Sequence, residues 1–217
     1  MLMRNWPVNV ISYPIDADFW KPISKKIMRE QLGLPKDVPL LLFGAFDSEK
    51  DQRKGYDLLL SALEKLKVHS KFQDVELVVF GQNKPELPTK HAIPIHYMGK
   101  IHDDESLRAI YNSCDVILIP SRQDNLPNIA VEAHACGIPV ISFNVGGLPD
   151  IIEHRRTGYI AKAFEIEDLT KGILWFLSHP DKEYLNRNVR EQAVLKFSQK
   201  KVAEEYLGIY KNLLQQI

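Results

Sequence analysis

Three side chains have the type and position to bind a ligand that carries hydroxyl groups and phosphate. Glu132 interrupts a helical stretch, from Pro127 to Cys136, that is otherwise almost entirely apolar or small. Arg53 and Lys54 stand at the expected start of another helix. A carboxylate accepts hydrogen bonds from a ribose, and a guanidinium fork or an ammonium group pairs with phosphate. Glu132 could therefore hold a ribose, and the basic pair could hold a phosphate.

The surroundings of Glu132 leave two interpretations open. Asn128 and Glu132 are four residues apart, so they share one helix face near its start. A helix apolar on nearly all sides is usually buried, and a buried carboxylate costs several kcal/mol unless it is hydrogen-bonded. Glu132 either binds a polar ligand such as a ribose, or it caps its own helix or pairs with a nearby arginine.

The loop GAFDSEKDQRKG, from Gly44 to Gly55, links the first strand to its helix. In nucleotide-binding folds this is where phosphates meet a helix N-terminus. Neither GxxxxGK[ST] nor GxGxxG occurs in the chain, so it has no Walker loop and no dinucleotide fingerprint. The loop is either a phosphate contact or a solvated charged loop. A second turn, Gly99-Lys100-Ile101, could read the edge of a base through its backbone, although such turns are usually structural.

Other kinds of chemistry have weak support. His91, His96 and His102 are not at metal-ligand spacing, and no cysteine accompanies them. Ser121 lacks the GxSxG elbow of a hydrolase nucleophile. We therefore expect neither a metal site nor a serine hydrolase.

The elements around Glu132 form a strand, a loop, a helix and a second strand. The apolar run Val116–Ile119 is followed by the polar loop Arg122–Asn125, a helix from Pro127 to Gly137, and the run Ile138–Phe143. This is the size of one right-handed parallel crossover. Ligands of open parallel sheets bind beyond the carboxyl ends of the strands, where the polar loop lies.

The same alternation extends along the chain. Further strand-like runs are Leu40–Phe43, Val75–Phe80, Ile93–Tyr97 and Tyr159-Ile160, with helical patterns between them. Continuous Val/Ile/Leu runs are typical of a parallel sheet covered on both faces. The predicted fold is a doubly wound, Rossmann-like α/β domain at 38–217 that ends in helices. Residues 1–37 are predicted to be an interdomain linker or arm, with one short strand at Val8–Ile11.

Composition excludes several classes. The 217 residues are 45% hydrophobic and 26% charged. The 28 Lys plus Arg residues equal the 28 Asp plus Glu residues, so no excess of positive charge favours binding to nucleic acid or to an anionic membrane. Cys114 and Cys136 lie in apolar contexts and are expected to be buried thiols in a reducing compartment. No run is long enough to cross a membrane, and the N-terminus lacks a signal peptide's apolar core. A cytoplasmic location is expected.

The stretch PSRQDNLPNIAVEAHACGIPVISFNVGGLPDII, residues 120–152, resembles the donor-binding signature of the retaining glycosyltransferases of family four. That signature has an acid, seven residues, Glu-Ala, Gly-x-Pro-Val and Gly-Gly, here Asp124, Glu132-Ala133, residues 137–140 and residues 146–147. VISYPIDADFWKP, residues 10–22, resembles the family's interdomain segment, and RKGYDLLLSAL, residues 53–63, resembles its phosphate-contact helix. The resemblance covers essentially the whole chain.

The resemblance implies a site for a nucleotide-sugar. Glu132 would bind the ribose, Asp124 would hold hydroxyls of the donor sugar, and Lys54 would neutralise the leaving diphosphate; the last two are the predicted catalytic residues. The other predicted substrate-binding positions are Gly44, Arg53, Lys100, Ile101, Asn125, Leu126, Pro127 and Asn128, of which 125–128 would act through the backbone and 100–101 would read the base. In two places the chain departs from the family: the first acid is usually the longer Glu, and an Arg usually stands where this chain has Ala45. Arg53 is the candidate to replace that arginine.

By resemblance, the chain is expected to be the C-terminal half of a two-domain GT-B glycosyltransferase. It would take a hexosyl group from a UDP- or GDP-sugar to a glycan or lipid-linked acceptor, without a metal or another cofactor. The acceptor would bind a missing N-terminal domain, so the isolated chain should bind donor weakly and transfer no sugar. The full-length enzyme would be cytoplasmic or peripheral to the inner membrane. Two alternatives are half of a nucleotide-sugar 2-epimerase and a non-catalytic nucleotide-binding module.

Overall fold

The computed structural model describes residues 8–44, 51–68, 74–85 and 91–215, and its centre is a parallel sheet of six strands in the order β3-β2-β1-β4-β5-β6. The strands are β1 Leu40–Gly44, β2 Glu76–Phe80, β3 Ile95–Tyr97, β4 Val116–Ile119, β5 Val140–Phe143 and β6 Gly158–Ala161. The helices are α1 Lys25–Gln31, α2 Tyr56–Lys67, α3 Asp104–Ser113, α4 Asn128–Ala135, α5 Leu148–Ile151, α6 Ile166–Leu177, α7 Lys182–Phe197 and α8 Gln199–Leu214, with a short 3₁₀ helix η1 at Gln52–Lys54. Each strand overlaps a predicted run.

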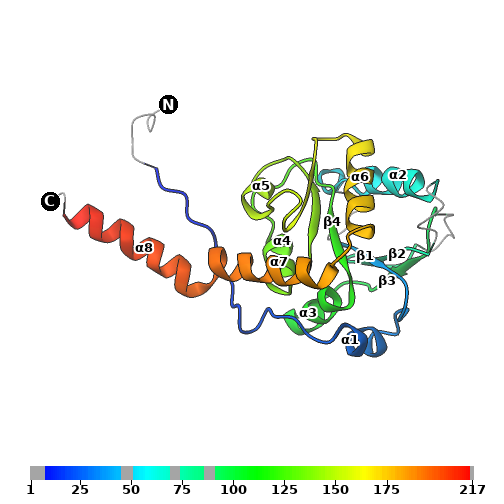
Figure 1. Cartoon of the computed structure of the whole chain (residues 1–217), viewed down its shortest axis with the longest axis horizontal. Coiled ribbons are helices and arrows are strands. Elements are labelled where there is room, and N and C mark those ends of the chain that lie inside the picture. Colours follow the sequence, from blue (N-terminus) through cyan, green and yellow to red (C-terminus); the bar gives the residue numbers. More distant parts are fainter. Residues whose placement is uncertain (1–7, 45–50, 69–73, 86–90, 216–217) are drawn as a thin grey trace.

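Alternate side chains of the strands fill two cores, one on each face of the sheet. Leu41 and Phe43 of β1 belong to the core that includes Leu59 of α2, whereas Leu40 and Leu42 belong to the core that includes Ile110 of α3. In Figure 1, α2 and α6 lie on one side of the sheet, and α1 and α3 lie on the other. Burial of both faces explains why the strands read as continuous apolar runs. The predicted doubly wound α/β fold is confirmed.

The strand order places a topological switch between β1 and β4. From β1 the chain moves outward to β2 and β3, and it then returns to pair β4 with the other side of β1. In open parallel sheets, ligands bind in the crevice outside the carboxyl ends of the strands at such a switch point. Gly44 at the end of β1 and the residues that follow Ile119 lie at this switch, and the sequence connects both with ligand binding.

The N-terminal segment lies against the core without joining the sheet. Residues 8–11 form no strand, so the strand expected at Val8–Ile11 is wrong. A short segment with three apolar residues makes a strand only where a neighbouring strand can pair with it. Further on, Ile15 and Trp20 are buried, and the Ile15 N–H donates to the Phe197 carbonyl over 2.7 Å. From that point α8, red in Figure 1, runs away from the sheet. The division at residue 37 stays a prediction.

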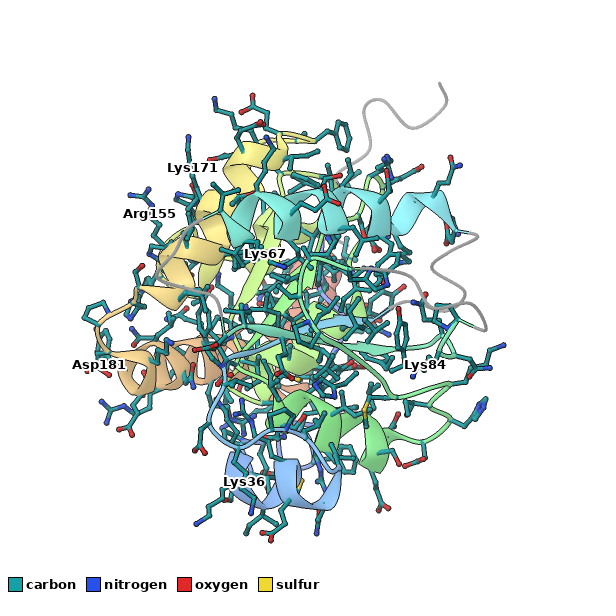
Figure 2. The ribbon with its side chains drawn as sticks, turned by 90° about the vertical axis from the view of Figure 1, so that its right-hand side faces the viewer. Lys36, Lys67, Lys84, Arg155, Lys171 and Asp181 are labelled. Atoms are coloured by element: carbon teal, nitrogen blue, oxygen red, sulfur yellow. The ribbon has the colours of Figure 1, made fainter. Side chains whose placement is uncertain are left out.

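Charged side chains are spread over the surface. In Figure 2, Arg155 and Lys171 point away from the ribbon on the side of α6, and Lys36 does so beside α1. Within the described part of the chain, no helix is both long and apolar enough to cross a membrane. Cys114 and Cys136 are buried free thiols, as the sequence predicts, and burial raises the pKa of each to about 12.

Candidate functional site

Lys54 and Asp124 meet in the crevice at the topological switch. Lys54 ends η1 after β1, and Asp124 lies in the loop after β4; the Lys54 Nζ is 3.0 Å from the Asp124 Oδ2. The Ser121 hydroxyl donates to the same carboxylate oxygen over 3.3 Å. The two charged side chains are 33% and 14% exposed, so the ion pair is partly sheltered from water. The structure thus brings together the two residues predicted to be catalytic.

A second ion pair joins the loops that carry Lys54 and Asp124. The Arg122 guanidinium donates to both carboxylate oxygens of Asp57, over 2.8 and 2.6 Å, and the Arg122 N–H donates to the Arg53 carbonyl over 2.7 Å. The backbones approach closely at Gly55, where φ is 69° and a Cβ would lie 1.9 Å from the Pro120 oxygen. These contacts fix the position of one loop relative to the other. The sequence gives no sign of the Arg122–Asp57 pair, because its members are 65 residues apart.

The glycine pair after β5 supports the loop of Asp124 from the other side. The Gly147 N–H donates to the Asn125 carbonyl over 2.5 Å. At Gly146 φ is 53°, and a Cβ there would lie 1.6 Å from the Asp124 carbonyl oxygen. A side chain at this position would collide with the loop, so the close backbone approach expected from Gly146-Gly147 is present.

The N-terminus of α4 directly follows the loop that carries Asp124. Pro127 is its N-cap and provides no side-chain hydrogen bond. The first N–H groups of a helix lack partners within it and carry the positive end of the helix dipole, so they suit an anion. Proline has no N–H, which limits the expected backbone donors to Asn125, Leu126 and Asn128. Their contact with a ligand stays a prediction.

Glu132 lies one helical turn after Asn128 and lines a pocket whose described lining contains neither Lys54 nor Asp124. The Tyr111 hydroxyl donates to the Glu132 Oε2 over 2.7 Å. Neither helix capping nor an arginine accounts for this carboxylate; its partner is a tyrosine of α3, which the sequence did not indicate. Burial raises the pKa of Glu132, and the hydrogen bond from Tyr111 opposes that rise.

The hollow beside Glu132 is a pocket of about 330 Å³. One wall belongs to α4 and the loop before it, and the other belongs to the N-terminal segment; the lining residues are Tyr13, Pro14, Ile15, Asp16, Trp20, Leu126, Asn128, Val131 and Glu132. Arg190 of α7 fixes the second wall, since it donates to the Trp20 and Ala17 carbonyls over 2.5 and 2.6 Å. Among the described residues, the lining includes two carboxylates, Asp16 and Glu132, and no cation.

The remaining predicted site residues contribute no side chain to the Lys54–Asp124 contact or to the described lining of the Glu132 pocket. The Arg53 guanidinium pairs with both carboxylate oxygens of Asp51, over 2.9 and 2.8 Å, and its side chain is 70% exposed. Lys100 and Ile101 follow β3 at the edge of the sheet and do not line the Glu132 pocket. Gly44 ends β1, and residues 45–50 lie outside the described part of the chain. Ligand contacts of Gly44, Arg53, Lys100 and Ile101 stay predictions.

Comparison with known proteins places this architecture in a family. Residues 38–179 match the family described as "Glycosyl transferases group 1". The D-inositol 3-phosphate glycosyltransferase of Saccharomonospora viridis is 27% identical over 221 residues, which cover 95% of this chain and 50% of that protein. The chain spans about half the length of the curated relatives it matches.

Solved structures show the same fold. The sucrose-phosphate synthase of Thermosynechococcus elongatus has a TM-score of 0.77 at 25% identity, over 99% of this chain and 56% of that one. Anabaena HepE, in complex with UDP and glucose, has a TM-score of 0.73 at 18% identity, over 94% of this chain and 56% of that one. The match over most of the domain shows that the chain belongs to the group 1 glycosyltransferase family.

Proposed function

We propose that this chain is the donor-binding half of a retaining glycosyltransferase. It would hold a UDP- or GDP-sugar and pass a hexosyl group to a glycan or lipid-linked acceptor bound by a further domain. The observation that carries the proposal is the contact of 3.0 Å between Lys54 Nζ and Asp124 Oδ2 just before the start of α4. Glu132 follows one turn further along the same helix.

Two separate anchors suit the length of a nucleotide-sugar. The ligand has hydroxyls at both ends and a diphosphate between them. The sugar would lie at Asp124, the diphosphate at Lys54 and the N-terminus of α4, and the ribose at Glu132. The described residues that line the pocket of Glu132 include two carboxylates and no cation, so the pocket suits neutral hydroxyl donors and disfavours phosphate.

The chemistry of transfer fits the same assignment. The bond between the anomeric carbon and the diphosphate oxygen breaks, its electron pair leaves with the diphosphate, and an acceptor oxygen forms the new bond and loses its proton. Retention means that the acceptor attacks from the face that the diphosphate leaves. Lys54 and the N–H groups at the start of α4 would stabilise the growing negative charge on the diphosphate. Lys54 would then contact both Asp124 and phosphate, or it would exchange Asp124 for phosphate.

The relatives support this class of ligand. HepE of Anabaena was solved with UDP-glucose, and it shares the fold of this chain at 17% identity. The buried free thiols agree with the reducing cytoplasm as the proposed place of action.

The direct test is a nucleotide panel with the 217-residue chain, read by calorimetry and thermal unfolding. UDP or GDP at about 100 times its Kd should stabilise the chain by roughly 2.7 kcal/mol, and NAD should have no effect. Equal stabilisation by NAD, or none by either diphosphate, would contradict a nucleotide-sugar site. The chain alone should show no sugar transfer, and turnover without a further domain would contradict its assignment as a donor-binding half.

A further inference from the structure

Tyr111 of α3 stands directly behind Glu132. Its side chain is 1% exposed, and its hydroxyl donates to the Glu132 Oε2 over 2.7 Å. Two aromatic rings hold its own ring in place: the centroid of Trp20 is 5.7 Å away and that of Phe80 is 6.2 Å away. Tyr111 does not line the pocket itself, and it touches two residues that do, Glu132 through its hydroxyl and Trp20 through its ring.

The hydrogen bond from Tyr111 uses one oxygen of the Glu132 carboxylate and leaves the other for a ligand. Oε2 accepts from the tyrosine, and within the described part of the chain Oε1 accepts no hydrogen bond. A carboxylate has capacity for several donors, so Glu132 keeps capacity for hydroxyl groups in the pocket it lines. Because Tyr111 already fixes the side chain of Glu132, that side chain loses less rotamer freedom when it binds a ligand.

We propose that Tyr111 is a positioning residue for the ribose: its hydroxyl fixes the carboxylate of Glu132 so that the free oxygen meets the ribose hydroxyls. The inference rests on the proposed function, because it requires a nucleoside in the Glu132 pocket.

The charges around Glu132 make the tyrosine hydrogen bond matter for pH. Burial raises the pKa of Glu132, Asp104 of α3 raises it further, and the hydrogen bond from Tyr111 lowers it. Asp16 lines the same pocket from the N-terminal segment, and nearby Cys136 has a pKa of about 12 and stays neutral. Loss of the tyrosine hydroxyl therefore raises the pKa of Glu132. Protonation, and with it the loss of ribose binding, then begins at a higher pH as the solution is acidified.

The test combines a variant with a change in the ligand. The wild-type chain and Tyr111→Phe are titrated by calorimetry with whichever of UDP and GDP binds more tightly, and with its 2′,3′-dideoxy counterpart. Tyr111→Phe should weaken binding of the ribonucleotide about tenfold, the effect of one charge-assisted hydrogen bond, and that of the dideoxy nucleotide less than twofold. The acid limb of the ribonucleotide's binding profile should also move to higher pH in the variant.

Tyr159→Phe is the matched control. Tyr159 is also buried, and its hydroxyl donates to the Asp168 carboxylate over 3.0 Å, but it lies on β6. This variant should lose stability in thermal unfolding without a change in nucleotide affinity. Equal losses for ribo- and dideoxynucleotide in Tyr111→Phe, or no loss for either, would overturn the positioning role. If the wild-type chain binds neither UDP nor GDP, the proposed function fails, and this inference falls with it.

Discussion

Substitution of Lys54 by alanine should weaken binding of the nucleoside diphosphate and leave binding of the nucleoside unchanged. Lys54 is a cation at the switch between β1 and β4, and its Nζ is 3.0 Å from the Asp124 Oδ2. A diphosphate at the N-terminus of α4 would take this ammonium group as a counter-charge. A nucleoside without phosphate would lack this contact, and no lysine is among the described residues that line the Glu132 pocket, where its ribose would lie.

The size of the effect follows from the surroundings of the lysine. Two unit charges 4 Å apart interact by about 4 kcal/mol at an effective dielectric constant of about 20. The side chain of Lys54 is 33% exposed, so water screens part of this energy, and the contact with Asp124 competes with phosphate. The remainder should be roughly 1.5–3 kcal/mol, the usual range for hydrogen bonds to charged groups. This corresponds to a loss of about tenfold to a hundredfold in affinity.

Calorimetry of Lys54→Ala with UDP, GDP and their nucleosides measures this loss. Lys65→Ala is the control, because Lys65 on α2 pairs with Glu167 of α6, over 2.7 Å, outside the crevice. The control should bind like the wild type. If Lys54→Ala binds the diphosphate with unchanged affinity, Lys54 is not the phosphate cation and the assignment of the crevice is refuted.

Three further predictions concern the scaffold and its stability. Gly146→Ala should lower the free energy of unfolding by at least about 2 kcal/mol, since a Cβ would collide with the Asp124 carbonyl; an unchanged urea midpoint would contradict this. Asp57→Arg should weaken diphosphate binding, because it breaks the ion pair with Arg122 that joins the loops of Lys54 and Asp124. Adding Arg122→Asp to the same chain should restore the pair and the affinity. Failure of this exchange to restore affinity would contradict a role of the ion pair in positioning the two loops. Burial lowers the pKa of His134 from 6.5 to about 3, so on acidification the unfolded chain takes up a proton before the folded chain does. The free energy of unfolding should therefore fall as the pH drops below 6.5, by about 2 kcal/mol at pH 5. Urea unfolding of His134→Gln should lack this fall.

The sheet could be predicted from the sequence because burial of both faces leaves a direct pattern. Runs such as Leu40–Phe43 are apolar at every position, and glycine or proline ends them. Val8–Ile11, which is apolar except at Asn9, shows the limit of such reasoning, since it lies in no strand. A largely apolar run indicates only that a segment could join a sheet. Whether it does depends on a neighbouring strand from elsewhere in the chain.

The site was predictable only in part, because its charges are assembled over long separations. Lys54 and Asp124 are 70 residues apart, and only a resemblance to a known signature connects them in the sequence. The partner of Glu132 could not be found from helix periodicity, since Tyr111 belongs to another helix, 21 residues earlier. Arg53 illustrates the opposite case: its pair with Asp51 is local, two residues away.

A crystal structure of the chain with UDP or GDP would test the central claim most directly. The account predicts phosphate oxygens within about 3 Å of the Lys54 ammonium group and of backbone N–H groups at the start of α4, with the ribose hydroxyls on Glu132. A nucleotide bound elsewhere on the sheet, or one whose ribose points away from the Glu132 pocket, would contradict it.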